Sequence, residues 1–192
     1  TAQLTFTDVA GVQLVGAGAA TTSLVGDGTT RLIEVTAGAL TVEDLALLDG
    51  NAGGNGGAIL TDDDPVTVRD ALVADNLADH GGAIHTGTGT VVVERSRFER
   101  NTAMQDALNG NGGAIDSVGG DVTIVDSTFE DGFAANTSGA IGVSADDLRI
   151  SGSTFTGNEA GASGAIYNSF GLIEITNSTF DENITTAIND NV

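Results

Sequence analysis

The acidic run Asp62–Asp64, which ends at Pro65, is the densest group of oxygen ligands in the sequence. It falls at a bend between two apolar segments, and Asp121 and the pair Asp146–Asp147 occupy equivalent bends further along the chain. Several carboxylate oxygens at one point are what Ca²⁺ prefers. Because the twelve-residue calcium loop and the nonapeptide calcium repeat are both missing, we expect solvated bends here, with a Ca²⁺ site as the alternative.

The two histidines of the chain, His80 and His85, flank a Gly-Gly-Ala-Ile string at 81–84. A zinc site would need both imidazoles together with a carboxylate such as Asp79. Ile84 is expected to point into the core, which turns His85 outward, while His80 falls in a turn. We therefore expect no convergence on one ion and predict no cofactor.

Catalysis on glycans would require paired carboxylates, or a carboxylate-bound cation with a basic side chain, in a groove with aromatic platforms. The chain has no Trp, no Lys and a single Tyr, Tyr167, and only Phe170 is a candidate exposed Phe ring. Zero Cys also excludes thiol catalysis, disulfides and Cys-type zinc sites. We predict a protein that is not an enzyme, with a polysaccharide lyase or glycoside hydrolase as the alternative.

The charge balance excludes several classes of partner. Six Arg stand against 27 Asp and Glu in 192 residues, and the formal net charge is −21. No basic patch exists for nucleic-acid phosphates, and an anionic membrane surface would repel the chain. The stretch Ala10–Gly26 is too short, and too often interrupted by Gly and Thr, to cross a membrane, so we expect a protein that is not membrane-inserted.

One string recurs and sets the organisation of the chain. Gly-Gly-Ala-Ile or Ser-Gly-Ala-Ile ends at five Ile residues that are 25, 31, 26 and 25 positions apart: Ile59, Ile84, Ile115, Ile141 and Ile166. An aliphatic residue follows each Ile by seven positions, and Val73 or a Phe follows by seven more. Apolar residues alternate with polar ones in these segments, which is the period of a half-buried strand. Ile33 begins a sixth copy without the glycines, so six repeats run from Ile33 to Phe180.

Repeats of about 25 residues with about three short strands each predict an all-β fold, a right-handed parallel β-helix of six to seven coils. The whole chain, 1–192, is expected to be one domain: a first coil over 1–32, six repeats over 33–183 and a C-terminal tail over 184–192. Whether these residues are a fragment of a longer solenoid is open. Stacked coils place like residues above one another at about 4.8 Å.

Three further columns accompany the Ile column. Glycines two residues before each Ile require either a left-handed backbone or close approach of the next coil. Phe residues stack in a buried column, with a small inward Ser two residues earlier. Asn, three residues after the Phe position, tolerates a left-handed turn and can bond to its copy in the next coil. The columns are Gly57, Gly82, Gly113, Gly139 and Gly164; Phe98, Phe129, Phe155 and Phe180; and Asn76, Asn101, Asn158 and Asn183, with Gly50 and Gly132 in the remaining coils.

The pairing of Gly-Gly-Ala-Ile with Phe-x-x-Asn resembles the polymorphic outer-membrane-protein repeat of bacterial right-handed β-helix passengers and surface proteins. The segments Gly11–Gly18 and Leu24–Gly28 are similar to the opening coil of such proteins. The resemblance implies a secreted or cell-surface scaffold or adhesin, autotransporter-like and extracellular, whose partner would be a surface receptor or a polysaccharide. The departures are Ser138 and Ser163 at the first glycine, and Gly132 at an Asn position.

Exposed charges also fall into columns, and they favour a structural role for Arg in register and solubility. Acids precede or follow four Arg residues on neighbouring coils, whereas Arg31 and Arg97 have no such neighbour. The expected groups are Glu43–Arg69–Glu94, Asp70–Arg95–Asp126, Asp75–Arg100–Asp131 and Arg149–Glu174.

Two further features concern binding. The interval between Phe98 and Ile115 is longer than its counterparts, and the surplus, Thr102–Asn111, is either a binding loop or a tolerated insertion. Neither end of the repeat array carries a recognisable cap. We therefore expect either that the natural protein continues beyond these residues or that isolated copies associate end to end, and such association would strengthen as salt screens the net charge.

Overall fold

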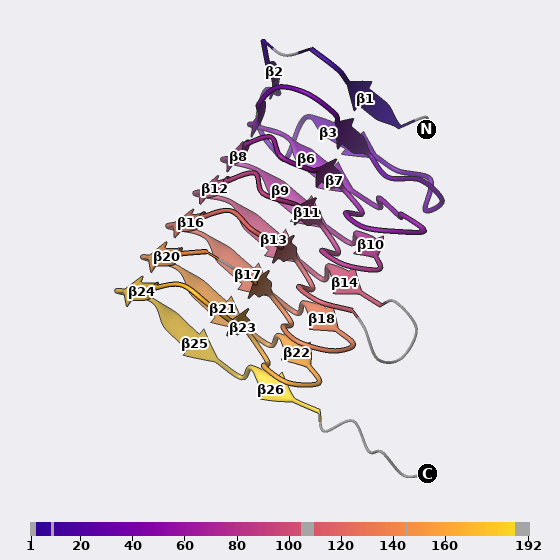
Figure 1. Ribbon diagram of the computed structural model, residues 1–192. Helices are drawn as coiled ribbons and strands as arrows, with labels where there is room; N and C mark the ends of the chain where they lie inside the picture. The colour runs from indigo at the N-terminus through magenta and orange to yellow at the C-terminus, as the bar shows by residue number, and fades with distance from the viewer. Residues whose placement is uncertain (1–2, 9, 105–109, 145, 187–192) are drawn as a thin grey trace.

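The computed structural model describes residues 3–8, 10–104, 110–144 and 146–186. Within these ranges the chain is all-β, with strands β1 to β26 and no helix, wound into a parallel β-solenoid of about 7 turns of roughly 26 residues (Figure 1). The predicted all-β parallel β-helix is confirmed. No helix capable of spanning a membrane occurs in the described ranges.

Four parallel sheets, here called A to D, run along the solenoid. Sheet A contains β1 (Leu4–Phe6), β4 (Ile33–Val35), β7 (Ile59–Thr61), β11 (Ile84–Thr86), β15 (Ile115–Ser117), β19 (Ile141–Val143) and β23 (Ile166–Asn168). Sheet B contains β2 (Val12–Val15), β5 (Leu40–Glu43), β8 (Val66–Arg69), β12 (Val91–Glu94), β16 (Val122–Val125), β20 (Leu148–Ser151) and β24 (Ile173–Thr176). Sheet C contains β3 (Ser23–Val25), β6 (Ala46–Leu48), β9 (Leu72–Ala74), β13 (Arg97–Glu99), β17 (Thr128–Glu130), β21 (Thr154–Thr156) and β25 (Thr179–Asp181). Sheet D contains β10 (Leu77–Ala78), β14 (Thr102–Ala103), β18 (Phe133–Ala134), β22 (Glu159–Ala160) and β26 (Ile184–Thr185).

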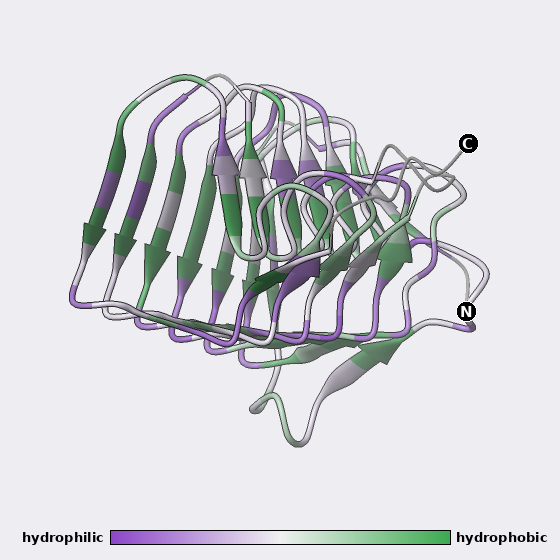
Figure 2. Cartoon of the chain, turned by 90° about the horizontal axis from the view of Figure 1, so that it is seen from below, coloured by the Kyte–Doolittle hydropathy of each residue, from purple (hydrophilic) through white to green (hydrophobic). Residues whose placement is uncertain are grey.

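The recurring Ile residues are direct neighbours across sheet A, where Ile84 pairs with Ile59 on one side and with Ile115 on the other. The 31-residue step between Ile84 and Ile115 is therefore absorbed outside the ladder. Hydrophobic segments lie mainly in the strands, and hydrophilic residues gather at the corners and turns (Figure 2). Inward-facing side chains of sheets A, B and C form one continuous core, and a second small cluster joins Ala103, Ala134 and Ala160 of sheet D.

The Phe column of sheet C is a face-to-face stack. Ring centroids of Phe98, Phe129, Phe155 and Phe180 are 4.8, 5.0 and 4.8 Å apart, with successive planes within 11° of parallel. The first three rings are buried, but Phe180 is 43% exposed. The expectation of four buried rings is thus wrong for Phe180, because it lies in the last described coil and only one of its faces is covered.

The corners between sheets B and C and between sheets C and D use a left-handed residue, which in most coils is followed by a Ser or Asn. The left-handed positions are Asp44, Asp70, Arg95, Asp126, Gly152 and Asn177 at the first corner, and Asp49, Asp75, Arg100, Asp131, Gly157 and Glu182 at the second. The buried residues that follow are mostly Ser at the first corner and Asn at the second. The Asn column itself is not left-handed, which corrects the sequence-based expectation by one position.

The two glycines of each Gly-Gly pair are required for different structural reasons. The first is left-handed, with φ of +65° at Gly56 and +58° at Gly81. The second allows two coils to touch: a Cβ on Gly57 would lie 2.3 Å from the Gly82 carbonyl oxygen, and one on Gly82 2.2 Å from that of Gly113. Close approach, rather than a left-handed backbone, therefore explains the glycine column.

Candidate functional site

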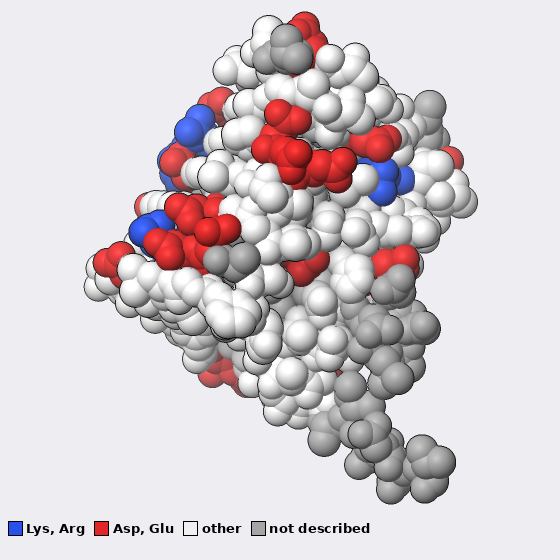
Figure 3. Space-filling view, viewed as in Figure 1, with Lys and Arg blue, Asp and Glu red and all other residues white. Residues whose placement is uncertain are grey.

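Every Arg side chain of the protein forms an ion pair, and each of them except Arg31 pairs with an acid on a neighbouring coil. Arg95 binds both carboxylate oxygens of Asp70, at 2.9 and 2.7 Å, and Arg100 binds both oxygens of Asp75, at 2.7 and 2.8 Å. The bonds from Arg95 lower the pKa of Asp70 below its ordinary value. Each basic group visible in the space-filling view adjoins acidic atoms (Figure 3).

Three Arg residues have partners that the repeat alignment did not indicate. Arg97 was expected to lack an acid on a neighbouring coil, but it pairs with Glu130 across the sheet as well as with Glu99. Arg149 pairs with Asp147 at 2.6 Å and with Asp121 at 3.5 Å. Glu174, its expected partner, forms no ion pair with it within the described ranges. Arg31 donates to the backbone carbonyls of Asn55 and Gly56 on the next coil, and it lies 3.9 Å from Glu34.

The acidic bends between sheets A and B use their carboxylates to hold one bend to the next. Asp64 Oδ1 accepts a hydrogen bond from Gly38 N at 2.9 Å, and Asp63 Oδ1 accepts one from Thr88 Oγ1 at 2.7 Å. Further along, Asp147 Oδ1 accepts from Leu172 N at 2.9 Å. This bond, helped by Arg149, lowers the pKa of Asp147. In the described part of the chain, no three His, Asp or Glu side chains converge to hold a metal ion.

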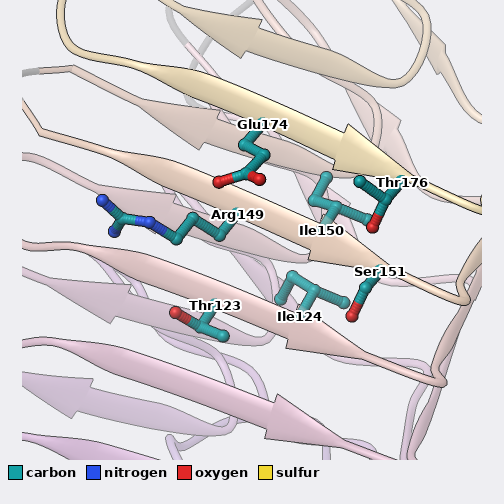
Figure 4. Close-up of a pocket in the computed structure, with 7 residues that line it drawn as sticks. All are labelled: Thr123, Ile124, Arg149, Ile150, Ser151, Glu174 and Thr176. Atoms are coloured by element: carbon teal, nitrogen blue, oxygen red, sulfur yellow. The ribbon is translucent and has the colours of Figure 1, made fainter.

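A shallow pocket of about 200 Å³ lies on sheet B near the last coils (Figure 4). Outward side chains of three adjacent strands line it: Thr123, Arg149, Ser151, Glu174 and Thr176. Arg149 lies between Thr123 and Glu174, and its guanidinium points away from Ser151 (Figure 4). Glu174 is the only carboxylate among the lining residues, so the pocket lacks the pair that glycoside hydrolysis requires.

A buried ionisable pair lies on the outer side of sheet A. His85 Nδ1 is 3.0 Å from Asp116 Oδ2 on the next strand, and His85 Nε2 is 3.2 Å from Asn55 Nδ2. His85 is 8% exposed and Asp116 is 5% exposed, so both side chains are buried although they lie on the outer side of the sheet. The alternation of side chains along the strand correctly predicts that His85 points away from the core. It does not predict that the turns between coils, such as the one that contains Asn55, cover this side of the sheet.

On the next strand of sheet A, the residue paired with Asp116 is Gly142. Polar atoms surround the space that a side chain at Gly142 would occupy. A Cβ on Gly142 would lie 2.9 Å from Ser138 Oγ and 3.4 Å from Asp116 Oδ1. The Ser138 hydroxyl is fully buried and has no hydrogen-bond partner in the described ranges. Ser138 lies on the carboxylate side of the pair, whereas the second ring nitrogen of His85, Nε2, contacts Asn55. Because the imidazole does not contact the hydroxyl, the group does not have the order of a serine nucleophile and its base.

The Thr102–Asn111 segment is only partly described. Thr102 and Ala103 form β14, and Met104 is 52% exposed. Residues 105–109, the centre of the expected insertion, lie outside the described residues. After them, Asn111 Oδ1 accepts hydrogen bonds from Asn136 Nδ2 and Thr137 Oγ1 of the next coil, which anchors the returning chain.

Comparison with known proteins adds no identification. No protein-family model, no curated protein and no solved structure matches this chain.

Proposed function

We propose that this chain is a non-catalytic structural scaffold or adhesin of the cell surface or of a secreted protein. It would belong with the bacterial surface proteins that carry polymorphic outer-membrane-protein-like repeats. The support is the resemblance of its Gly-Gly-Ala-Ile and Phe-x-x-Asn strings, together with the solenoid that those strings build. A surface receptor or a polysaccharide would be its partner.

One observation carries the proposal: the repeated polar side chains bind the neighbouring coil. Ser96 N donates to Ser127 Oγ, Asn76 Nδ2 donates to Asn101 Oδ1, and Arg100 pairs with Asp75. Side chains engaged in this way stabilise a long regular body and are not arranged around a reacting centre. A rod of stacked coils with an acidic, Arg-interrupted surface suits display at a distance from its attachment point.

Surface labelling of the source cells tests the location. When intact cells are treated with a membrane-impermeant carboxyl-reactive probe, the protein should be labelled through its Asp and Glu side chains, and mild protease treatment should remove it. Labelling only after cell lysis would contradict a surface role, unless the protein is recovered from the culture medium.

A carbohydrate-active enzyme is the alternative, and the pocket around Arg149 and Glu174 is the observation in its favour. Incubation with a panel of neutral and acidic polysaccharides should yield no new reducing ends and no unsaturated products. Turnover that disappears in Glu174→Gln and persists in a matched Glu159→Gln variant would establish the alternative and overturn the scaffold proposal.

A further inference from the structure

Three buried polar groups on the outer side of sheet A have no partner among the described residues, and all three lie beside Gly142. The Ser138 hydroxyl is fully buried and forms no hydrogen bond in the described ranges. Asp116 contacts His85 through Oδ2, while its Oδ1 accepts no hydrogen bond from any described group. The backbone N–H of Gly112, also a buried residue, is the third group. Buried polar groups of folded proteins nearly always have a partner in the protein or in ordered water.

The Gly112 N–H lacks a partner because the next turn differs from its counterparts. Gly81 N, the equivalent atom one coil earlier, donates to Asn111 O at 2.9 Å, whereas no described carbonyl accepts from Gly112 N. Gly81 and Gly112 are left-handed, with φ of 58° and 61°. Ser138 stands at this position in the following coil and does not adopt a positive φ. The turn that would supply the acceptor therefore follows a different path.

The three groups surround the space that a side chain at Gly142 would occupy. A Cβ on Gly142 would lie 2.9 Å from Ser138 Oγ, 3.4 Å from Asp116 Oδ1 and 3.6 Å from Gly112 N. These are the nearest atoms to that point apart from the glycine and its chain neighbours. One hydroxyl, one carboxylate oxygen and one N–H donor therefore converge on a single small space.

The backbone does not require a glycine at position 142. Gly142 lies in the middle of β19, and its φ is outside the left-handed region. A glycine inside a strand weakens the strand, and it often marks a place where another group approaches closely. Its two neighbours across the sheet, Asp116 and Tyr167, both have long side chains. The glycine thus provides room for a species that the three polar groups can bind.

We propose that one water molecule is bound in this space. Its oxygen accepts a hydrogen bond from Gly112 N, one hydrogen is donated to Asp116 Oδ1, and a third bond is formed with the Ser138 hydroxyl. Three hydrogen bonds are the usual number for a buried water. A cation would face the N–H group and an anion would face the carboxylate. The set of donors and acceptors therefore favours a neutral species that both donates and accepts.

The bound water completes a polar chain along the outer side of sheet A. Asn55 contacts Nε2 of His85, and Nδ1 of His85 contacts Asp116. The water extends this chain from Asp116 to Ser138, so four successive coils, from the turn before β7 to the turn before β19, are joined. This inference concerns the interior of the protein and does not rest on the proposed surface role.

Direct observation of the water is the first test. A crystal structure of the wild-type chain that orders other internal waters should show one density peak within hydrogen-bond distance of Asp116 Oδ1 and Ser138 Oγ. In solution, the Gly112 amide proton should give an NOE to a long-lived water. The Gly81 amide is the internal control, because it donates to a carbonyl and should give none.

Stability measurements are the second test, because the sign of one effect depends on the water. Removing a buried hydroxyl that has no partner should stabilise a protein, whereas removing one that binds a water should not. We therefore expect Ser138→Ala to lower the midpoint of urea denaturation. Ser163→Ala is the matched control, since Ser163 is the equivalent residue one coil later and is only partly buried, and it should leave the midpoint nearly unchanged.

Filling the space is the third test. Gly142→Ala places a methyl group against Ser138 Oγ, the end of a side chain that can rotate, so the backbone is not obstructed. The methyl group should displace the water, abolish the NOE to Gly112 and lower the denaturation midpoint. If this variant does not fold, the wild-type crystal structure and NOE decide.

Three outcomes would overturn the proposal. The first is a wild-type crystal structure that orders other internal waters and has no density beside Gly142. The second is a Gly112 amide with no stronger NOE to water than that of Gly81. The third is a Ser138→Ala variant that is more stable than the wild type, which would mean that the hydroxyl is buried without a partner.

Discussion

Asn101 Oδ1 accepts two hydrogen bonds from Asn76, one coil earlier: one from Nδ2 at 2.9 Å and one from the backbone N at 3.2 Å. Asn101 Nδ2 donates in turn to the carbonyl of Val73 at 2.8 Å. Both Asn residues are 1% exposed. The column thus needs a side chain that donates and accepts at once, which an amide supplies and a carboxylate does not.

Replacing Asn101 with Asp should therefore destabilise the solenoid. The new carboxylate would be buried with no cation beside it and would lose the bond to Val73, so we expect a loss of about 3–5 kcal/mol in the free energy of unfolding. Urea denaturation measures it. Asn183→Asp is the control, because Asn183 accepts the same bonds in the last described coil but is only partly buried. Equal losses in the two variants would contradict the argument from burial.

Columns of like residues could be predicted from the sequence because the solenoid places each repeat on the last in register. The backbone conformation at the corners could not, since Asp75 and Arg100 adopt φ of 58° and 49° although Arg has no intrinsic preference for that region. Asn76 and Asn101, which directly follow these two residues, are typical of left-handed turns. The sequence therefore indicates the left-handed conformation one position too late.

The partners of Arg97 and the burial of His85 were harder to predict. Both depend on contacts between residues that do not occupy equivalent positions in successive repeats. Arg97 reaches Glu130, a diagonal neighbour on the adjacent strand, and an alignment of equivalent positions does not bring the two together. His85 is buried by turns that cover the outer side of sheet A. Alternation within one strand specifies which way a side chain points and is silent on what covers it.

The stacked Phe column should contribute according to its burial. Phe155→Ala should cost about 3–5 kcal/mol, since the ring is fully buried between Phe129 and Phe180 and leaves a cavity. Phe180→Ala should cost clearly less because that ring is covered on one face only. Thermal and urea unfolding of both variants measure the difference, and the reverse order would show that the last coil is more enclosed than its exposure indicates.

The His85–Asp116 pair should respond asymmetrically to substitution. His85→Leu leaves a buried carboxylate without its partner and should cost about 3–5 kcal/mol. Asp116→Asn keeps a hydrogen-bond acceptor for the imidazole and should cost about 1 kcal/mol. Urea denaturation at neutral pH compares the two. A His85→Leu variant as stable as Asp116→Asn would mean that Asp116 regains water or another partner when the ring is removed.

The Arg columns should stabilise the protein in a salt-dependent manner. Arg100→Glu places a third acid beside Asp75 and Glu99, so the melting temperature should fall, and fall more at low salt than at high salt. Arg100→Gln, which removes the charge without reversing it, should give a smaller and less salt-dependent decrease. Melting curves of Arg100→Glu that match the wild type at both salt concentrations would exclude this role.

Acid should weaken the protein partly through Asp70. Arg95 holds the pKa of this carboxyl below its ordinary value in the folded state, so between the two values the unfolded chain binds more protons than the folded one. The stabilisation is complete above the unfolded pKa, about 3.9, and is lost as the pH falls through the lower folded value. As the pH is lowered from 5, the melting temperature of the wild type should therefore fall more steeply than that of Asp70→Asn. Arg95→Gln is the matched control: it removes the cation and should return the Asp70 pKa, followed by NMR, toward its ordinary value. An Asp70 titration that is the same in Arg95→Gln as in the wild type would assign the shift to some other group.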